Sequence, residues 1–219
     1  MSAHHDHAIR FDGTSPAYRR ALSAVVVINA AMFAVEMSAG ALSGSRSLQA
    51  DALDFFADAL TYGLSLWAIG RATGLRARVA QIKGLSLAAM GLWVLGSTLW
   101  QFFGPEVPRA GIMGGVGGMA LLANLASVVI LMQWRDGDAN VRSVWLCSRN
   151  DAVGNIAVMA AAVLVAVTGT AWPDLIVAAL MAGLFLSSAL QILRRAAAER
   201  SGHAHTHDHD HHHEDHKTA

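Results

Sequence analysis

Six long apolar stretches occupy most of the chain, and each is long enough to cross a lipid bilayer as a helix. A spanning helix needs about 20 mostly apolar residues to cross a hydrocarbon core of roughly 30 Å. Polar, proline-containing or glycine-containing turns separate the stretches. The expected spans are 19–42, 48–70, 80–103, 111–134, 143–168 and 173–193. The sequence therefore predicts an all-α integral membrane protein with six transmembrane helices.

Composition supports a membrane protein and divides the chain into three parts. Of the 219 residues, 54% are hydrophobic and 15% are charged, whereas about 25% charged is usual in soluble domains. The single cysteine, Cys147, excludes an intramolecular disulfide. We expect a cytoplasmic N-terminal tail over 1–17, a six-helix domain over 18–198 and a histidine-rich, disordered tail over 199–219.

The basic residues predict the orientation in the membrane. Fourteen of the 16 lysines and arginines fall in the tails or around the second and fourth connections, and only Arg46 and Arg109 fall on the other side. Because basic residues accumulate on the cytoplasmic side of membrane proteins, both termini are expected in the cytoplasm. The expected location is a multi-pass position in an inner membrane of the bacterial type.

Three aspartates lie in the second expected span. Asp54 and Asp58 are four residues apart, so their side chains share one helix face, and Asp51 lies one turn earlier on nearly the same face. Two ionised carboxylates this close repel each other, and one would stay protonated unless a cation lay between them. The pair is therefore a candidate for binding a divalent cation and exchanging it for protons. Asp51 at the span end could equally be wetted and structural.

A second polar row lies on the fifth expected span. Cys147, Asp151 and Asn155 follow one another at intervals of four residues. A thiolate suits soft metals such as zinc or cadmium, and four ligands from two helices could make a tetrahedral site. Cys147 could instead be a small buried apolar residue, and Asn155 could hydrogen-bond a neighbouring helix.

Further polar residues lie inside the first and fourth spans. Glu36 and Asn29 are seven residues apart on the first span, and Asn124 lies in the fourth. Each could support a metal ligand or join two helices by a hydrogen bond. Joining helices is the expected role of Asn29 and Asn124, whereas Glu36 could carry a proton.

All eleven histidines lie in the two tails. Their interleaving with aspartate, glutamate, threonine and alanine argues against an engineered affinity run. Such a tract cannot build a core but can bind zinc, nickel or copper weakly at several places. We expect metal capture by the C-terminal histidines, which are His203, His205, His207, His209, His211, His212, His213 and His216. A smaller cluster, His4-His5-Asp6-His7, lies at the other end.

The histidine distribution also argues against an enzyme. No serine–histidine pair falls within the spans, and the glycines of the fourth span follow no strand, so they are no nucleotide-binding fingerprint. No nucleic-acid partner is expected, and no cofactor besides the transported metal and its counter-ion protons.

Several of these polar positions together resemble the cation diffusion facilitator family of proton-coupled divalent-metal exporters. The resemblance covers roughly residues 18–195. It rests on Asn29-x3-Phe33-x2-Glu36-x3-Gly40-x3-Gly44-Ser45-x-Ser47-Leu48-x-Ala50-Asp51-Ala52-x-Asp54-x3-Asp58, on Cys147-x3-Asp151-x2-Gly154-Asn155, and on Trp172-Pro173-Asp174. The resemblance implies a metal site made by Asp54 and Asp58 with Cys147 and Asp151. It also implies a homodimer.

Two departures from the family pattern affect these expectations. Cys147 stands where the family has a histidine, which leaves no histidine in the expected membrane site. Pairing Asp151 with Asn155 instead would shift the residues that follow, so Cys147 with Asp151 is preferred. Most members also carry a cytoplasmic ferredoxin-like domain, and only about twenty-five residues follow the last span here, too few for such a fold. The expectation is a short form whose histidine tail partly takes over metal capture.

The functional hypothesis is proton-coupled efflux of a divalent metal from the cytoplasm by alternating access. Zinc is the leading cargo, followed by cadmium, cobalt and nickel, with iron(II) or manganese(II) also compatible with the ligands. Asp51, Asn155 and Glu36 are secondary candidates at the metal site. The alternative is a membrane-bound metal-binding or sensory protein that does not transport, which the histidine-to-cysteine departure keeps open.

Overall fold

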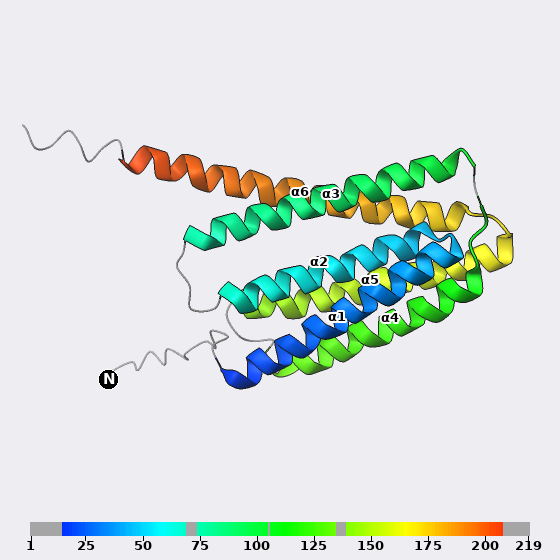
Figure 1. The fold of residues 1–219 in the computed structure, drawn as a ribbon, viewed down its shortest axis with the longest axis horizontal. Coiled ribbons are helices and arrows are strands. Elements are labelled where there is room, and N and C mark those ends of the chain that lie inside the picture. Colours follow the sequence, from blue (N-terminus) through cyan, green and yellow to red (C-terminus); the bar gives the residue numbers. More distant parts are fainter. Residues whose placement is uncertain (1–14, 69–73, 105, 135–138, 208–219) are drawn as a thin grey trace, which may run out of the picture.

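The computed structural model describes residues 15–68, 74–104, 106–134 and 139–207, with the backbone alone at 68, 74–80, 139–150, 195–196 and 198–207. These residues form six long helices (Figure 1), so the predicted all-α fold is confirmed. The helices are α1 Pro16–Ser43, α2 Arg46–Ala68, α3 Gly74–Phe102, α4 Ala110–Leu131, α5 Ala139–Thr168 and α6 Trp172–His207. A short 3-10 turn, Met132–Trp134, continues α4.

Five of the helices are long and apolar enough to cross a membrane. These segments are Pro16–Ser43, Gln81–Phe102, Ala110–Trp134, Asp151–Thr168 and Trp172–Arg194. The remaining helix, α2, has 23 residues, about 35 Å of helix, which is long enough to cross a membrane. Its aspartates make it more polar than the other five helices, so it is not among these apolar segments. Large apolar side chains such as Leu42, Leu122 and Val167 are 68–79% exposed, as side chains in contact with lipid are. The protein is a multi-pass membrane protein.

Local sequence explains where the helices begin and end. Ser15 caps α1 by accepting a hydrogen bond of 3.2 Å from the backbone N–H of Tyr18, and Pro16 occupies the first turn. Gly44 ends α1 with φ 75°, a left-handed conformation that glycine adopts without strain, and it permits the tight reversal into α2. Gly169, with φ 66°, ends α5 in the same way.

The alternating helices give the bundle two distinct ends. In Figure 1, α1 begins and α6 ends on the same side, which we call the terminal end. The α1–α2, α3–α4 and α5–α6 connections lie at the opposite side, which we call the far end. Helices α2 and α5 therefore run antiparallel. The expectation that the terminal end faces the cytoplasm stays a prediction.

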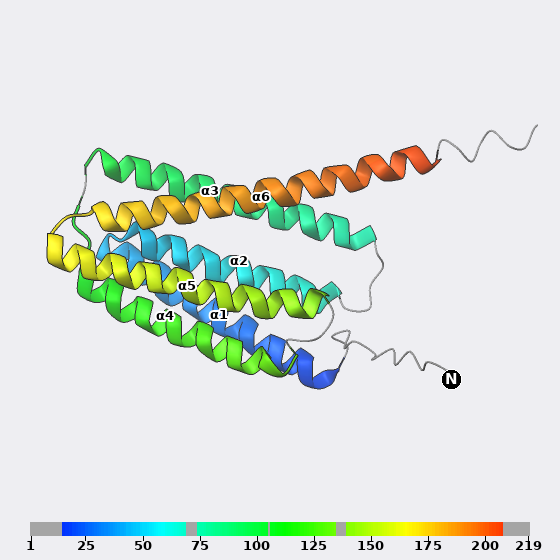
Figure 2. The same cartoon turned by 180° about the vertical axis from the view of Figure 1, so that it is seen from behind.

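The helices form two groups. Helices α3 and α6 pack mainly against each other and lie side by side in both views (Figure 1 and Figure 2). Two glycines of α3 allow this close approach: a Cβ at Gly84 would come within 2.9 Å of Leu193 Cδ2, and one at Gly91 within 2.8 Å of Leu186 Cγ. The second group is α1, α2, α4 and α5, in which α1 contacts α2 and α4, and α4 contacts α5.

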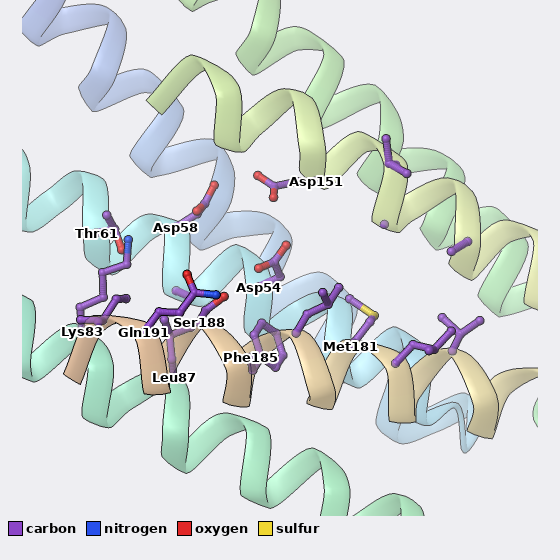
Figure 3. Close-up of a pocket in the computed structure, with 18 residues that line it drawn as sticks. Asp54, Asp58, Thr61, Lys83, Leu87, Asp151, Met181, Phe185, Ser188 and Gln191 are labelled. Atoms are coloured by element: carbon purple, nitrogen blue, oxygen red, sulfur yellow. The ribbon is translucent and has the colours of Figure 1, made fainter. Parts of the chain in front are cut away.

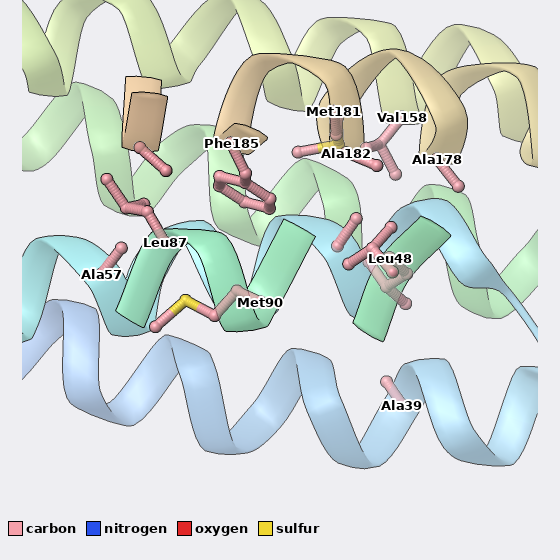
Figure 4. Close-up of a cluster of buried hydrophobic side chains, with 13 residues drawn as sticks. Ala39, Leu48, Ala57, Leu87, Met90, Val158, Ala178, Met181, Ala182 and Phe185 are labelled. Carbon is pink, nitrogen blue, oxygen red and sulfur yellow. The ribbon is translucent and has the colours of Figure 1, made fainter. Parts of the chain in front are cut away.

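An apolar cluster fills the space between the two groups. Figure 4 shows its side chains converging from α2, α3, α5 and α6. Leu48, Val94 and Val158 are at most 1% exposed, and Ala178 and Ala182 are fully buried. Because Leu48 and Ala178 lie close to the beginnings of α2 and α6, this packing closes the bundle toward the far end.

Helix α6 continues to His207, beyond the expected span end at 193 and into the tract expected to be disordered from 199. The physical reason is local: 196–200 is Ala-Ala-Ala-Glu-Arg, and these residues have high helix propensity. His203, His205 and His207 thus lie on the helix, where only the backbone is described. The remaining tail histidines and the cluster His4-His5-Asp6-His7 lie outside the described residues.

Candidate metal site

The aspartates of α2 and α5 come together inside the bundle. Asp54 and Asp58 of α2 and Asp151 of α5 line one small gap, and Phe55 and Asn124 complete its wall. The Asp151 carboxyl interacts with both Asp54 and Asp58. The structure thus brings together three of the four residues expected at the primary site. We call Asp54, Asp58 and Asp151 the α2–α5 site.

Asn124 is the unexpected member of this wall. The sequence favours it as a residue that joins two helices, yet the described structure puts it in the same gap as the carboxyls, from α4. Its side chain is only 3% exposed. An amide oxygen beside carboxylates can ligate a divalent cation or hold a ligand in position. Its isolation in an otherwise apolar helix was the only signal in the sequence.

A larger cavity adjoins the α2–α5 site and extends along the bundle from Lys83 and Ile192 to Ala157 and Val177. It has a volume of about 660 Å³ and is lined by residues of α2, α3, α5 and α6. Its polar lining beyond the aspartates comprises Thr61, Lys83, Ser188 and Gln191, which Figure 3 shows on the terminal side of Asp54. The remainder of the lining is apolar, including Leu87, Met181 and Phe185. The carboxyls of Asp54, Asp58 and Asp151 therefore face a cavity whose other polar side chains lie toward the terminal end.

Two neighbours tune the charge at the α2–α5 site. The hydroxyl of Tyr62 donates a hydrogen bond of 2.5 Å to Asp58 Oδ2 and fixes the orientation of that carboxyl. Lys83, on α3, interacts electrostatically with both Asp54 and Asp58. The sequence suggested only that Lys83 flanks a membrane span, whereas the structure places it in the wall of the cavity.

Cys147 stays a prediction as the fourth ligand. It lies on α5 one turn before Asp151, on the same helix face and nearer the terminal end, but its side chain is outside the described part of the structure. Among the side chains that are described, no three histidines, cysteines, aspartates or glutamates stand close enough to hold a metal ion as they are. The α2–α5 site is thus a set of carboxyls that a cation would have to draw together.

A second pair of carboxyls lies next to this site. Glu36 of α1 interacts with Asp51 of α2, and both interact with Asp54. Glu36 is fully buried and Asp51 is 2% exposed. Asn155, one turn after Asp151 on the same face of α5, is fully buried as well. These are the three residues that the sequence marks as secondary, and two of them are adjacent in the fold.

At the far end, Asp174 holds the beginning of α2. Asp174 is fully buried in the first turn of α6 and accepts hydrogen bonds of 2.6 Å from the hydroxyls of both Ser45 and Ser47. It also accepts from the backbone N–H of Arg46 at 2.8 Å and of Ser47 at 3.0 Å. We call Asp174, Ser45 and Ser47 the far-end seal.

The Arg46 side chain extends this seal to α3. Arg46 Nε donates to Gln101 Oε1, and Gln101 Nε2 donates to the Gly44 carbonyl at 3.1 Å. Sequence reasoning missed the role of Asp174, because an aspartate in the first turn of a helix ordinarily caps that helix itself. The two serine hydroxyls at the beginning of α2 were the available signal.

Sequence comparisons relate the chain to known cation transport proteins. Residues 79–199, more than half of the chain, match the cation efflux transmembrane domain family. The chain is 28% identical over 204 residues to the zinc transporter ZitB of Pectobacterium atrosepticum, covering 87% of this chain and 62% of that protein. It is 24% identical over 174 residues to the metal cation efflux system protein CzcD of Cupriavidus metallidurans, covering 74% and 55%.

A third relative, the zinc transporter ZitB of Escherichia coli, is 27% identical over 180 residues, covering 76% of this chain and 58% of that protein. The chain thus matches between 55% and 62% of the length of these three relatives.

Proposed function

Because the chain belongs to the family of cation efflux transmembrane domains, we propose that it exports a divalent metal cation from the cytoplasm in exchange for protons. The observation that carries the proposal is the convergence of Asp54, Asp58 and Asp151 on one gap beside an accessible cavity. Unpaired carboxylates at membrane depth cost several kcal/mol, so such a cluster is retained where it meets a cation or a proton.

The cavity beside the carboxyls supports entry of metal from the terminal end, which the distribution of basic residues predicts to face the cytoplasm. A hydrated cation would exchange its water for the carboxylates of the α2–α5 site. Asp54 and Asp58 contribute from α2 and Asp151 from α5, with Cys147 one turn away as the fourth ligand. Tyr62 holds the Asp58 carboxyl in orientation through its hydrogen bond.

Zinc is the cargo that we propose first, and two relatives bear the name zinc transporter. Carboxylate oxygens with one thiolate suit tetrahedral zinc, and the thiolate also admits cadmium. Cobalt and nickel are the cargo ions that we propose next. A homodimer stays a prediction of the sequence.

Protons act as the counter-ion in this proposal. The same carboxylates that bind metal must lose protons to do so, so metal and protons compete for one site. Alternating access would close the cavity at the terminal end and open the far-end seal, after which protons displace the metal. The far-end seal and the apolar cluster around Leu48 and Ala178 support the interpretation that the structure is closed at the far end.

Metal flux in proteoliposomes with an imposed pH gradient tests the proposal. We expect zinc transport by the wild-type protein and loss of transport in Asp58→Asn and Asp151→Asn, with normal folding by size-exclusion chromatography. The matched control is Glu106→Gln, which removes an exposed carboxylate outside the site and should transport normally. Normal flux in either site variant would refute the assignment. Metal binding without any flux in the wild type would instead favour the metal-binding or sensory alternative.

A further inference from the structure

The pair Glu36 and Asp51 lies apart from the cavity that reaches the α2–α5 site. Neither residue lines that cavity, and both are at most 2% exposed. Both oxygens of Glu36 and Oδ2 of Asp51 receive no hydrogen bond from any side chain or backbone group other than the partner carboxyl, with which each interacts. Buried polar groups without partners are rare in folded proteins and each calls for an explanation. Two carboxyls whose partners are each other are satisfied by a shared proton, and a cation that binds between them at some stage of the cycle would take the place of that proton.

The pair is one helical step nearer the far end than the α2–α5 site. Asp51 precedes Asp54 on α2, which runs from the far end to the terminal end. Helix α5 runs the other way, so the step from Asp151 to Asn155 also leads toward the far end. Asp51 and Asn155 are thus displaced in the same direction from their neighbours in the α2–α5 site.

Helix α5 leaves room beside Asp51. A Cβ added at Gly154 would lie 3.9 Å from Asp51 Oδ1 and would meet no other heavy atom within 4 Å outside its own chain neighbours. The next residue, Asn155, is fully buried, and neither its amide oxygen nor its amide nitrogen has a hydrogen-bond partner. An unpartnered amide oxygen is a further ligand of the type that divalent cations accept.

On the other side of the pair lies the far-end seal. Ser47 is four residues before Asp51 on α2, one turn nearer the far end on the same face. The order along α2 toward the far end is therefore the α2–α5 site, the pair and the seal. The carboxyls of the pair do not line the cavity, and they interact with each other and with Asp54.

We propose that Glu36 and Asp51, with the amide oxygen of Asn155, form a second divalent-cation site that receives the metal from the α2–α5 site on its way to the far end. This inference rests on the proposed export function. The second site has only oxygen ligands, so it binds zinc less tightly than a site with a thiolate and favours onward release. Two sites in series allow the metal to move through steps of a few ångströms.

A direct test places a thiolate at the site in a background that has no other cysteine. In Cys147→Ser protein, Glu36→Cys and Asp51→Cys should each develop a thiolate-to-metal charge-transfer band when cobalt(II) is added. The matched control is Met32→Cys, one turn from Glu36 on the same helix face, buried at 7% exposure and packed against Phe55 and Ala120. It should give no such band.

A transport test separates this inference from the proposed function. Glu36→Gln and Asp51→Asn should keep zinc binding at the α2–α5 site within about twofold while maximal flux falls about tenfold or more. Glu36→Asp, which keeps the charge, should recover much of the flux, whereas a merely structural role would leave it as impaired as Glu36→Gln.

The outcomes are distinct. Transport by the wild type with no cobalt band in either cysteine variant would overturn the second site and leave the proposed function standing. Wild-type maximal flux in both Glu36→Gln and Asp51→Asn would overturn it as well. Absence of wild-type flux would instead remove the export function itself, and the cobalt band would still report whether a cation binds at the pair.

Discussion

Asp174 Oδ1 accepts a hydrogen bond of 2.6 Å from the Ser47 hydroxyl, and this joins the first turn of α6 to the beginning of α2 although the two residues are 127 positions apart. The same carboxylate accepts from Ser45 and from two backbone N–H groups. A buried carboxylate that is satisfied from every side holds these two helices at a fixed separation, and it makes the far end a discrete closure.

Removing this carboxylate should loosen the far end. Hydrogen bonds to a charged acceptor contribute roughly 1.5–3 kcal/mol each, so Asp174→Ala should destabilise the protein by about 3 kcal/mol or more and lower its Tm. The milder Asp174→Asn should let an impermeant maleimide added from the far side label a cysteine at Ala50, in a Cys147→Ser background. Thr170→Ala, an exposed change in the same turn region, is the control. Equal labelling with and without Asp174→Asn would show that the seal does not gate access.

Lys83 should weaken metal binding at the α2–α5 site. Its positive charge interacts with Asp54 and Asp58 and repels an arriving cation. We expect Lys83→Gln to tighten the apparent metal affinity about fivefold, an effect of roughly 1 kcal/mol for partly screened charges. Lys83→Arg keeps the charge and should bind like the wild type in the same calorimetric titration. Weaker binding in Lys83→Gln would mean that the lysine organises the carboxylates instead of opposing the cation.

Metal affinity should fall as the pH falls. Binding requires deprotonated ligands, so each bound metal displaces protons, and acid shifts the equilibrium toward the metal-free protein. A plot of log affinity against pH should have a slope of about one to two protons per metal. The Asp58→Asn variant should show a smaller slope, because one titrating ligand is gone. A flux that ignores the direction of an imposed pH gradient would contradict proton exchange.

Cys147 should tune which metal is carried. A thiolate favours soft ions, and histidine at this position would supply a nitrogen ligand instead. We expect Cys147→His to improve zinc or cobalt transport relative to cadmium, and Cys147→Ser to weaken cadmium transport most. A competition flux assay with all three metals measures this. An unchanged order of preference in both variants would assign Cys147 to packing and leave the fourth ligand to Asn124, Asn155 or water.

The C-terminal histidines should raise the apparent metal affinity without being essential. Deleting residues 203–216 removes eight histidines and leaves the α2–α5 site intact. The concentration for half-maximal flux should rise, with little change in the maximal rate. A matched variant with these histidines replaced by serine should behave like the deletion. Complete loss of transport would make the tail a part of the transport mechanism.

The sequence predicted the helices well because their determinants are local. Apolar length marks the spans, and Gly44 and Gly169 mark the ends of α1 and α5 within a few positions, whereas α6 continues well beyond its expected end at 193. The grouping of Asp54, Asp58 and Asp151 follows from helix periodicity once α2 and α5 are assumed adjacent. The role of Asp174 could not be predicted from periodicity, because it depends on how α6 packs against the beginning of α2.

The same limit applies to Asn124 and Lys83. Among the side chains that the structure describes, each is the one charged or amide group that its helix contributes to the α2–α5 site or the adjoining cavity, so no spacing pattern links it to the aspartates. An amide inside an apolar span made Asn124 noteworthy in the sequence, but only the packing of α4 shows which residues it meets. Lys83 lies close in sequence to Arg71, Arg76 and Arg78, which flank a membrane span, so the sequence did not distinguish it from them.

The close backbone approach of α3 to α6 at Gly84 and Gly91 has a mechanical consequence. Two helices that interlock this tightly move together more readily than they slide past each other, because sliding would drive Leu186 and Leu193 into the glycine backbones. A conformational change that opens or closes the cavity would therefore move α3 and α6 together, as one rigid unit, against the other four helices. This unit would pivot at the apolar cluster around Leu48 and Ala178. Replacing Leu48 or Ala178 with a larger side chain should therefore block the conformational change while leaving every charged residue unchanged.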